Sequence, residues 1–222
     1  MANPPIFYPT FHGQVPQVRA ILRADPTALH ARDAKDLTPL HVAAKRGQAA
    51  VAELLLAQGA DVHGPTHGGG WTPIVHAAYR GHLEVVRLLI ERGADVTEAG
   101  GDPIHFAGQR GHRAVCKLLV EHGAIDALVG EDGDARALFR AAHSFDAEGV
   151  DAQLAATPSL VDRRDARGRS ALHEVCTYGD LATAKVLLAR GADRTLVDAN
   201  GETPLDRAER HRKRRLVALL RR

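Results

Sequence analysis

The feature that most constrains this chain is a segment of about 34 residues that recurs along it. The repeat is clearest in TPLHVAAKRGQAAVAELLLAQGAD from Thr38, TPIVHAAYRGHLEVVRLLIERGAD from Thr72 and SALHEVCTYGDLATAKVLLARGAD from Ser170. The second residue of each copy marks the period. These residues are Pro39, Pro73, Pro103, Ala137, Ala171 and Pro204, and the spacings between them are 34, 30, 34, 34 and 33 residues. A period of this length predicts a solenoid, in which each unit buries its apolar face against its neighbours.

Each copy carries the signals of two short helices. Thr38 and Thr72 are N-cap residues, and the Pro that follows each costs nothing at the first helical position because its missing N–H would be unpaired there anyway. Helices of about eight to ten residues are marginal alone, since isolated helices need roughly 12 to 15. Stacking must therefore supply the core. We expect that core at Leu54, Leu55, Val85, Leu88, Leu89, Val115, Leu118, Leu119, Val186, Leu187 and Leu188.

These copies resemble the ankyrin repeat, whose pattern runs G-x-T-P-L-H-x-A-A-x-x-G-H-x-x-V-V-x-L-L-L-x-x-G-A-D. Several positions match in five copies, and two weaker copies, from Gly13 and from Arg136, complete the set. The resemblance implies an all-α ankyrin-repeat solenoid of stacked helix-turn-helix units with β-hairpin or loop fingers. It covers 1–222 as a single domain whose units lie at about 5–35, 36–69, 70–99, 100–132, 133–167, 168–200 and 201–222.

Three departures from the pattern carry predictions of their own. Pro9 stands where later first helices carry Ala, which predicts a short or broken helix in an N-terminal capping unit. Only 10 residues separate Gly93 from Pro103, so the finger between the third and fourth units should be truncated. In the fifth unit Arg136 and Ala137 stand in place of the cap residue and the Pro. We expect this unit to be the least stable part of the stack and to open locally most readily.

Composition limits the classes of protein that this chain can belong to. A net charge of +2 with 25% charged and 45% apolar residues is that of a soluble, ordered chain. No run approaches the roughly 18 apolar residues of a membrane span, so we expect no membrane partner. Cys116 and Cys176 lack CxxC spacing and align with core positions, which predicts buried, reduced thiols. We therefore expect a cytoplasmic monomer.

Each motif that suggests chemistry lacks a required part. HGGG at 67–70 is typical of some lipase oxyanion holes, but the chain has no GxSxG elbow, and its glycines lack the lysine of a phosphate-binding loop. His63 and His67 are four residues apart, yet they fall in a finger rather than on a helix. The acidic GEDGD segment has His143 where a calcium loop starting at Asp132 needs Glu, so we interpret it as a solvated loop. We expect no catalytic site, no metal and no cofactor.

What remains is a binding surface. The resemblance implies a non-enzymatic scaffold that holds a protein partner by its fingers and first helices, which line a concave face. Aromatic and Arg side chains are enriched among interface hot spots. We therefore expect contacts at Trp71, His76, Tyr79, Arg80, Phe106, Arg110, Arg140, His143 and Tyr178. One contiguous patch should contain Trp71, His76, Tyr79, Phe106 and Arg110, unless Tyr79 and Phe106 merely cover the site left by the short finger.

The alternative partner is a nucleic acid or a nucleotide phosphate. Residues 205–222 carry eight Lys or Arg against two Asp or Glu, and Arg46, Arg80, Arg110 and Arg140 line the same groove. Aromatic residues that would stack on bases are not interleaved with the C-terminal basic residues. We therefore interpret the basic terminus chiefly as the polar outer face that a last repeat requires.

Overall fold

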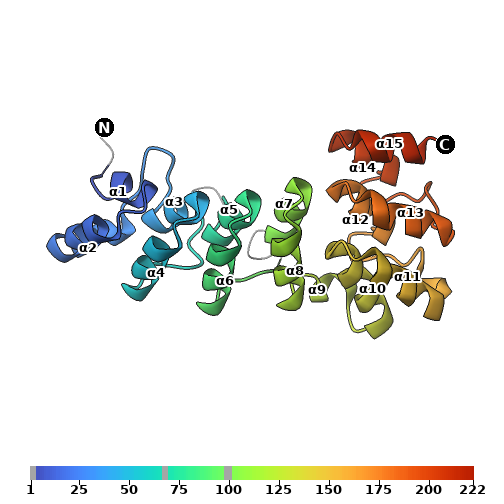
Figure 1. The fold of residues 1–222 in the computed structure, drawn as a ribbon, viewed down its shortest axis with the longest axis horizontal. Helices are drawn as coiled ribbons and strands as arrows, with labels where there is room; N and C mark the ends of the chain where they lie inside the picture. Colours follow the sequence, from blue (N-terminus) through green and yellow to red (C-terminus); the bar gives the residue numbers. More distant parts are fainter. Residues whose placement is uncertain (1–3, 67–69, 98–101) are drawn as a thin grey trace. The chain divides into compact units, whose positions relative to one another are not determined.

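The computed structural model describes residues 4–66, 70–97 and 102–222, and the regular elements of this part of the chain are helical. Contacts divide the chain into two compact units, Met1–Ala107 and Gly108–Arg222. The helices of the first unit are α1 (Phe7–Phe11), α2 (Val15–Ala24), a 3-10 turn (Pro26–His30), α3 (Pro39–Arg46), α4 (Ala49–Ala57), α5 (Pro73–Arg80), α6 (Leu83–Glu91) and the start of α7 (Pro103–Arg110). Within this unit α1, α3 and α5 form one row, and α2, α4 and α6 form a second row beside it (Figure 1).

The second unit begins with the last turn of α7 and stacks its helices in the same way. Its first helices α10, α12 and α14 form one column, and α11, α13 and α15 form another (Figure 1). The helices are α8 (Arg113–Glu121), α9 (Asp126–Val129), α10 (Gly133–His143), α11 (Ala147–Ala156), a 3-10 turn (Pro158–Leu160), α12 (Ala171–Tyr178), α13 (Leu181–Ala189), α14 (Pro204–Arg210) and α15 (Arg214–Leu220).

Capping residues fix where the helices begin and end. The Thr38 side chain accepts the backbone N–H of His41, whose ring in turn accepts the backbone N–H of Thr38, so two unpaired donors are satisfied at once. Gly47 ends α3 in the left-handed region, at φ 72°. The prediction for Pro9 is confirmed, because α1 is only five residues long.

The fingers are loops rather than β-hairpins in the part of the chain that the structure describes. Their one strand-like feature is an isolated bridge between Arg164 and Ser170. Asp33, Asp165 and Asp198 each accept the backbone N–H groups two and four residues further on, at 2.8 to 3.1 Å. One carboxylate thus satisfies amides that a hairpin ladder would otherwise pair, and the loop needs no strands.

The fifth unit starts earlier than its alignment suggests. α10 begins at Gly133, four residues before Ala137, because Asp132 accepts the Ala135 N–H at 3.0 Å and acts as the N-cap. The expectation that GEDGD is only a solvated loop is therefore wrong, since its second half opens a helix. Residues 67–69 of the HGGG motif and residues 98–101 of the finger predicted to be truncated lie outside the described part of the chain.

Most of the predicted core residues are buried, but some members of the apolar runs are not. Leu89 is fully buried, whereas Leu88, Val186 and Leu188 are only half-buried, because neighbouring positions point about 100° apart around a helix and those in α6 and α13 turn partly to solvent. Cys116 and Cys176 are free and buried as predicted, and burial raises the pKa of each thiol to about 12. None of the described helices is long and apolar enough to cross a membrane.

Candidate functional site

Four aromatic side chains meet on the first unit, and we refer to Trp71, His76, Tyr79 and Phe106 as the Trp71 cluster. The Trp71 ring lies 4.5 Å from the Phe106 ring, 5.0 Å from Tyr79 and 5.2 Å from His76, measured between centroids. Tyr79 and Phe106 are 6.4 Å apart. All these separations fall in the range of favourable edge-to-face or offset ring contacts. The four rings are half-buried, so each packs against others and still reaches the surface.

The repeat itself holds the cluster in place. Trp71 is the last finger residue before the Thr72 cap of α5, and His76 and Tyr79 share one face of that helix because they are three residues apart. The His41 Nε2–H on α3 donates to the Trp71 carbonyl at 3.1 Å. The capping box of one repeat thereby anchors the finger of the next, so Trp71 sits on a fixed backbone.

His76 of the cluster and the buried His41 form an uncharged pair. Their rings meet edge to face at 5.7 Å. The pKa of both rings is lowered to about 4, chiefly by burial; for His76, repulsion from His41, Lys45 and Arg80 contributes to this value. Both rings are therefore neutral at neutral pH, which agrees with the Nδ1 of His41 accepting the Thr38 hydroxyl at 2.7 Å.

The predicted contact residues in the second unit fall into a different environment. Tyr178 and His143 are only 4% and 3% exposed, so the expectation that they form an accessible surface is wrong. The Tyr178 ring lies 5.4 Å from His143 and 5.8 Å from Phe145. The cause is Gly108: a Cβ at that position would lie 2.4 Å from Tyr178 Cδ1, so only glycine allows the end of α7 to approach α12.

Arg140 and Arg110 are two further predicted contact residues, and both lie in the second unit. Arg140 makes a fork-like pair with Asp126, with nitrogen–oxygen distances of 2.6 to 3.1 Å, so its charge is compensated within the unit. Arg110 is exposed at the C-terminal end of α7. It belongs to the second unit, and the Trp71 cluster belongs to the first.

A buried ionic network in the second unit was not predicted from the sequence. Arg207 is 2% exposed and donates to Asp198 at 3.0 Å and to the Thr177 hydroxyl at 2.8 Å. Arg169 pairs with Glu174 at 3.1 Å and approaches the same Asp198 at 3.5 Å. The sequence does contain a signal for this network, at one position of the repeat. In the first unit that position is Val42, His76 and Phe106, whereas in the second unit it carries alternating charges, at Arg140, Glu174 and Arg207.

Several cations of the basic C-terminus are also held by contacts within the second unit. Arg207 turns inward, Arg210 pairs with Glu202, and Arg221 pairs with Glu209. Lys213 donates to the Gln109 carbonyl at 2.9 Å, and burial lowers its pKa. Half of the eight cations of residues 205–222 are thus engaged in contacts inside the second unit.

The Trp71 cluster offers a surface of mutually packed aromatic rings. Among the residues with described coordinates, no group of three or more His, Cys, Asp and Glu side chains is placed to hold a metal ion. The His76 ring of the cluster and the His41 ring beside it are both neutral at neutral pH. The chemistry of the cluster is therefore that of apolar and π contacts.

Comparison with known proteins identifies the repeat of this chain as the ankyrin repeat. Sequence models described as ankyrin repeats in three copies match residues 6–99 and 40–137, and one described as ankyrin repeats in many copies matches residues 154–208. Over 46 residues the chain is 52% identical to the serine/threonine-protein kinase VIK of Arabidopsis thaliana. The match involves 21% of this chain and spans only 10% of the length of that kinase.

Two solved structures share the fold over almost the whole chain. The ankyrin repeat domain of human ASB11 superposes with a TM-score of 0.65 at 23% identity, covering 93% of this chain and 92% of that one. The structure of the predatory endopeptidase Bd0816 from Bdellovibrio bacteriovorus, in complex with immunity protein Bd3460, matches with a TM-score of 0.51 at 24% identity. That match covers 96% of this chain and 95% of the other.

Proposed function

Because this chain belongs to the ankyrin repeat family, we propose that it is a non-enzymatic scaffold that binds a protein partner through its first unit. Ankyrin repeats are generally protein–protein interaction modules, and one of the matched structures is a protein complex. The proposed surface is the first-helix face, made by α1, α3, α5 and the start of α7 together with Trp71. It corresponds to the concave face expected for stacked repeats.

The observation that carries this proposal is the packing of Trp71. Its ring contacts three others within 5.2 Å and yet remains half-buried. A large ring that is already immobilised loses little conformational entropy when it binds, so more of its contact energy appears as affinity. Half-buried aromatic anchors held in this way are typical of interface hot spots.

The second unit is a weaker candidate for the same role. Its equivalent positions carry Arg140, which is paired with Asp126, and Tyr178 and His143, which are buried. A partner would have to displace these contacts before it could bind there. The proposed contact residues are therefore Trp71, His76, Tyr79, Arg80 and Phe106, all of which belong to the first unit.

We place this scaffold in the cytoplasm and expect it to act as a monomer. Two free, buried cysteines fit a reducing compartment, since neither depends on a disulfide. A nucleic-acid partner is the competing proposal. It is disfavoured because much of the basic C-terminus is engaged internally, as Arg207 and Lys213 illustrate.

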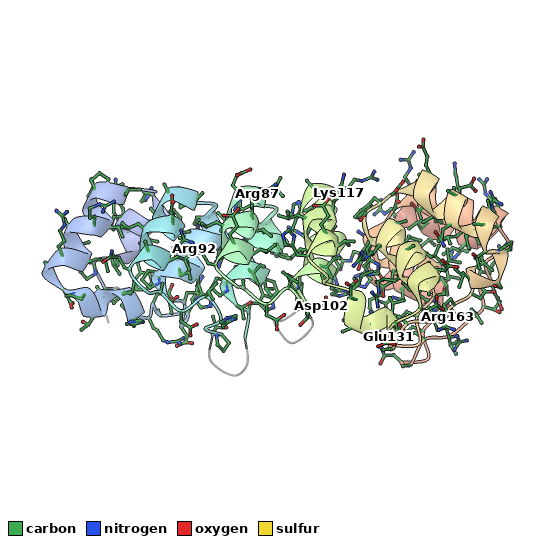
Figure 2. The ribbon with its side chains drawn as sticks, turned by 90° about the horizontal axis from the view of Figure 1, so that it is seen from below. Arg87, Arg92, Asp102, Lys117, Glu131 and Arg163 are labelled. Atoms are coloured by element: carbon green, nitrogen blue, oxygen red, sulfur yellow. The ribbon has the colours of Figure 1, made fainter. Side chains whose placement is uncertain are left out.

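Site-specific photo-crosslinking tests the placement of the surface. A photoreactive phenylalanine analogue replaces Tyr79 on α5 in one variant and Arg87 on α6 of the same repeat in the other. Arg87 is exposed, and Figure 2 shows it at the edge of the unit opposite Asp102, which precedes α7. We expect a discrete protein adduct in a lysate from position 79 only. Adducts from position 87 and none from position 79 would refute the proposed face.

A further inference from the structure

Charge is segregated between the two rows of helices in the first unit. Residues 1–107 contain nine Lys and Arg against ten Asp and Glu, so the unit as a whole is slightly acidic. The first helices α1, α3 and α5 nevertheless carry Lys45, Arg46 and Arg80 and not one Asp or Glu. The acidic side chains lie on second helices and in loops, as Glu53 on α4 does. The first-helix face is therefore positively charged, although the first unit as a whole is slightly acidic.

These three cations form no ion pair in the part of the chain that the structure describes, whereas arginines of the second unit such as Arg140 and Arg207 do. The cations are also close to one another: burial lowers the pKa of Lys45, and repulsion from Lys35, Arg80 and Arg46 lowers it further. Against these effects, Asp33 is the carboxylate that acts on Lys45 and raises its pKa. Neighbouring positive charges that repel each other attract an anionic ligand.

Aromatic rings hold the two guanidinium groups in place. Arg46 lies over the Phe11 ring at 3.7 Å from its centroid, and Arg80 lies over Tyr79 at 5.7 Å. The Gln48 side-chain amide donates to the Phe11 backbone carbonyl at 3.0 Å, which holds the backbone that carries the ring beneath Arg46. Stacking occupies the flat side of a guanidinium and leaves its N–H edge available for a carboxylate.

An apolar pocket of about 430 Å³ adjoins these charges at the N-terminal end of the face. We refer to it as the Phe11 pocket; its walls include Phe7, Tyr8, Phe11 and Val42, with Asp33 at its polar side. Tyr8 is 68% exposed and Phe11 38%, which is unusual for side chains of this size. The pocket is large enough for one or two apolar side chains of a ligand.

We infer that the first-helix face binds an extended acidic peptide segment, whose carboxylates pair with Lys45, Arg46 and Arg80 while an apolar side chain enters the Phe11 pocket. The inference deepens the proposed function and rests on it, because it names the chemistry of the partner at the same face. Opposite charge selects the partner segment, and the Trp71 cluster and the Phe11 pocket supply apolar contacts on either side of α3.

The spacing of the repeat suits an extended chain. Arg46 and Arg80 end successive first helices, and packed helices lie about 8 to 10 Å apart. A peptide in the extended polyproline II conformation advances about 3.1 Å per residue with about three residues per turn, so residues three apart point to the same side and are separated by about 9 Å. Acidic residues at every third position would therefore meet Arg46 and Arg80 in turn.

A peptide fits this surface better than a nucleic acid does. Phe11 and Tyr79 stack on guanidinium groups of their own chain, so these faces are not open to stack bases as single-strand binding requires. Asp33 at the Phe11 pocket places a negative charge where a phosphate backbone would pass. A peptide can present an amide or a hydroxyl to Asp33 instead.

A random library of 12-residue peptides displayed on phage tests the inference, with the full chain as bait. We expect the selected peptides to be enriched in Asp and Glu over the unselected library. A selected peptide, made synthetically and labelled with fluorescein, should then bind Arg46→Glu and Arg80→Glu about tenfold or more weakly by anisotropy. The matched control is Arg87→Glu on α6, which should change the Kd by less than about twofold.

The outcomes separate this inference from the proposed function. The inference is overturned if the selected peptides lack acidic enrichment, or if they bind the Arg80→Glu and Arg87→Glu variants equally well. If those same peptides bind Trp71→Ala more weakly than the wild type, the proposed function still stands. Acidic peptides that need Arg46 but bind Trp71→Ala unchanged support the charged surface and refute the role of the Trp71 cluster. A twelve-nucleotide oligothymidylate that binds more tightly than the peptides, with the same Arg dependence, overturns the inference in favour of nucleic acid.

Discussion

Lowering the pH should destabilise the first unit, and the His41 and His76 pair should account for much of the loss. Both rings have a folded-state pKa of about 4, against an ordinary value of 6.5. Between those values the unfolded chain binds more protons than the folded one, so the free energy of unfolding falls as the pH drops through this window. Above pH 6.5 the stabilisation is fully present.

The size of the effect follows from the two pKa values. Linkage gives a loss of about 2 kcal/mol for each ring between neutral pH and pH 5, rising to about 3 kcal/mol well below pH 4. Replacing His76 by Phe should remove about half of this acid sensitivity. The replacement suits the site, because Phe106 occupies the same position of the next repeat. An exposed histidine of the same unit, changed in His63→Gln, is the control and should leave the sensitivity intact.

Urea titrations followed by Trp fluorescence measure this directly. Trp71 is the only tryptophan of the chain and lies 5.2 Å from the His76 ring, so its emission reports on the unit in question. The difference in unfolding free energy between about pH 7.5 and pH 5 should be clearly larger for the wild type than for His76→Phe. Equal differences in the two proteins, or a wild type that gains stability in acid, would show that these rings are not buried in neutral form.

Three further predictions concern stability. Leu89→Ala should lower the free energy of unfolding by about 2 to 5 kcal/mol, because it empties a fully buried site, whereas Leu88→Ala on the half-buried neighbouring position should cost less; denaturant titration would contradict us if the order were reversed. Arg207→Met should cost about 3 kcal/mol by leaving Asp198 without its closest cation, while the exposed Arg214→Met should cost little, and equal thermal stability of the two variants would refute the network. In native-state hydrogen exchange, α11 should open more readily than α6, and equal protection of the two helices would contradict a weak fifth unit.

Much of the fold could be predicted because its determinants are local. A Thr cap, a Pro at the first helical position and a left-handed glycine each act within a few residues, so α3 and α5 appear where the repeat places them. The Trp71 cluster could be anticipated for a related reason. His76 and Tyr79 share a helix face by their spacing, and the repeat brings Trp71 and Phe106 beside them.

The misplaced features depend on contacts that the repeat alignment does not contain. α10 begins at Gly133 because Asp132 provides a cap four residues ahead of the aligned position, and a local preference of this kind overrides the period. Tyr178 is buried because Gly108, 70 residues earlier in the chain, permits a close approach. A single sequence reveals that Gly108 replaces an Ala of the repeat, but it does not reveal which side chain occupies the space that the missing methyl group leaves.

If a protein partner binds the Trp71 cluster, removing the Trp71 ring should lower the affinity measured in a titration with the partner that is crosslinked through position 79. Isothermal calorimetry would compare the wild type with Trp71→Ala and with Ile90→Ala, a half-buried apolar control on α6 of the same repeat. We predict that Trp71→Ala weakens binding by about 2 kcal/mol, roughly 30-fold in Kd, with helicity unchanged, and that Ile90→Ala binds as the wild type does. Unchanged affinity of Trp71→Ala, in a variant that circular dichroism finds fully folded, would contradict the account.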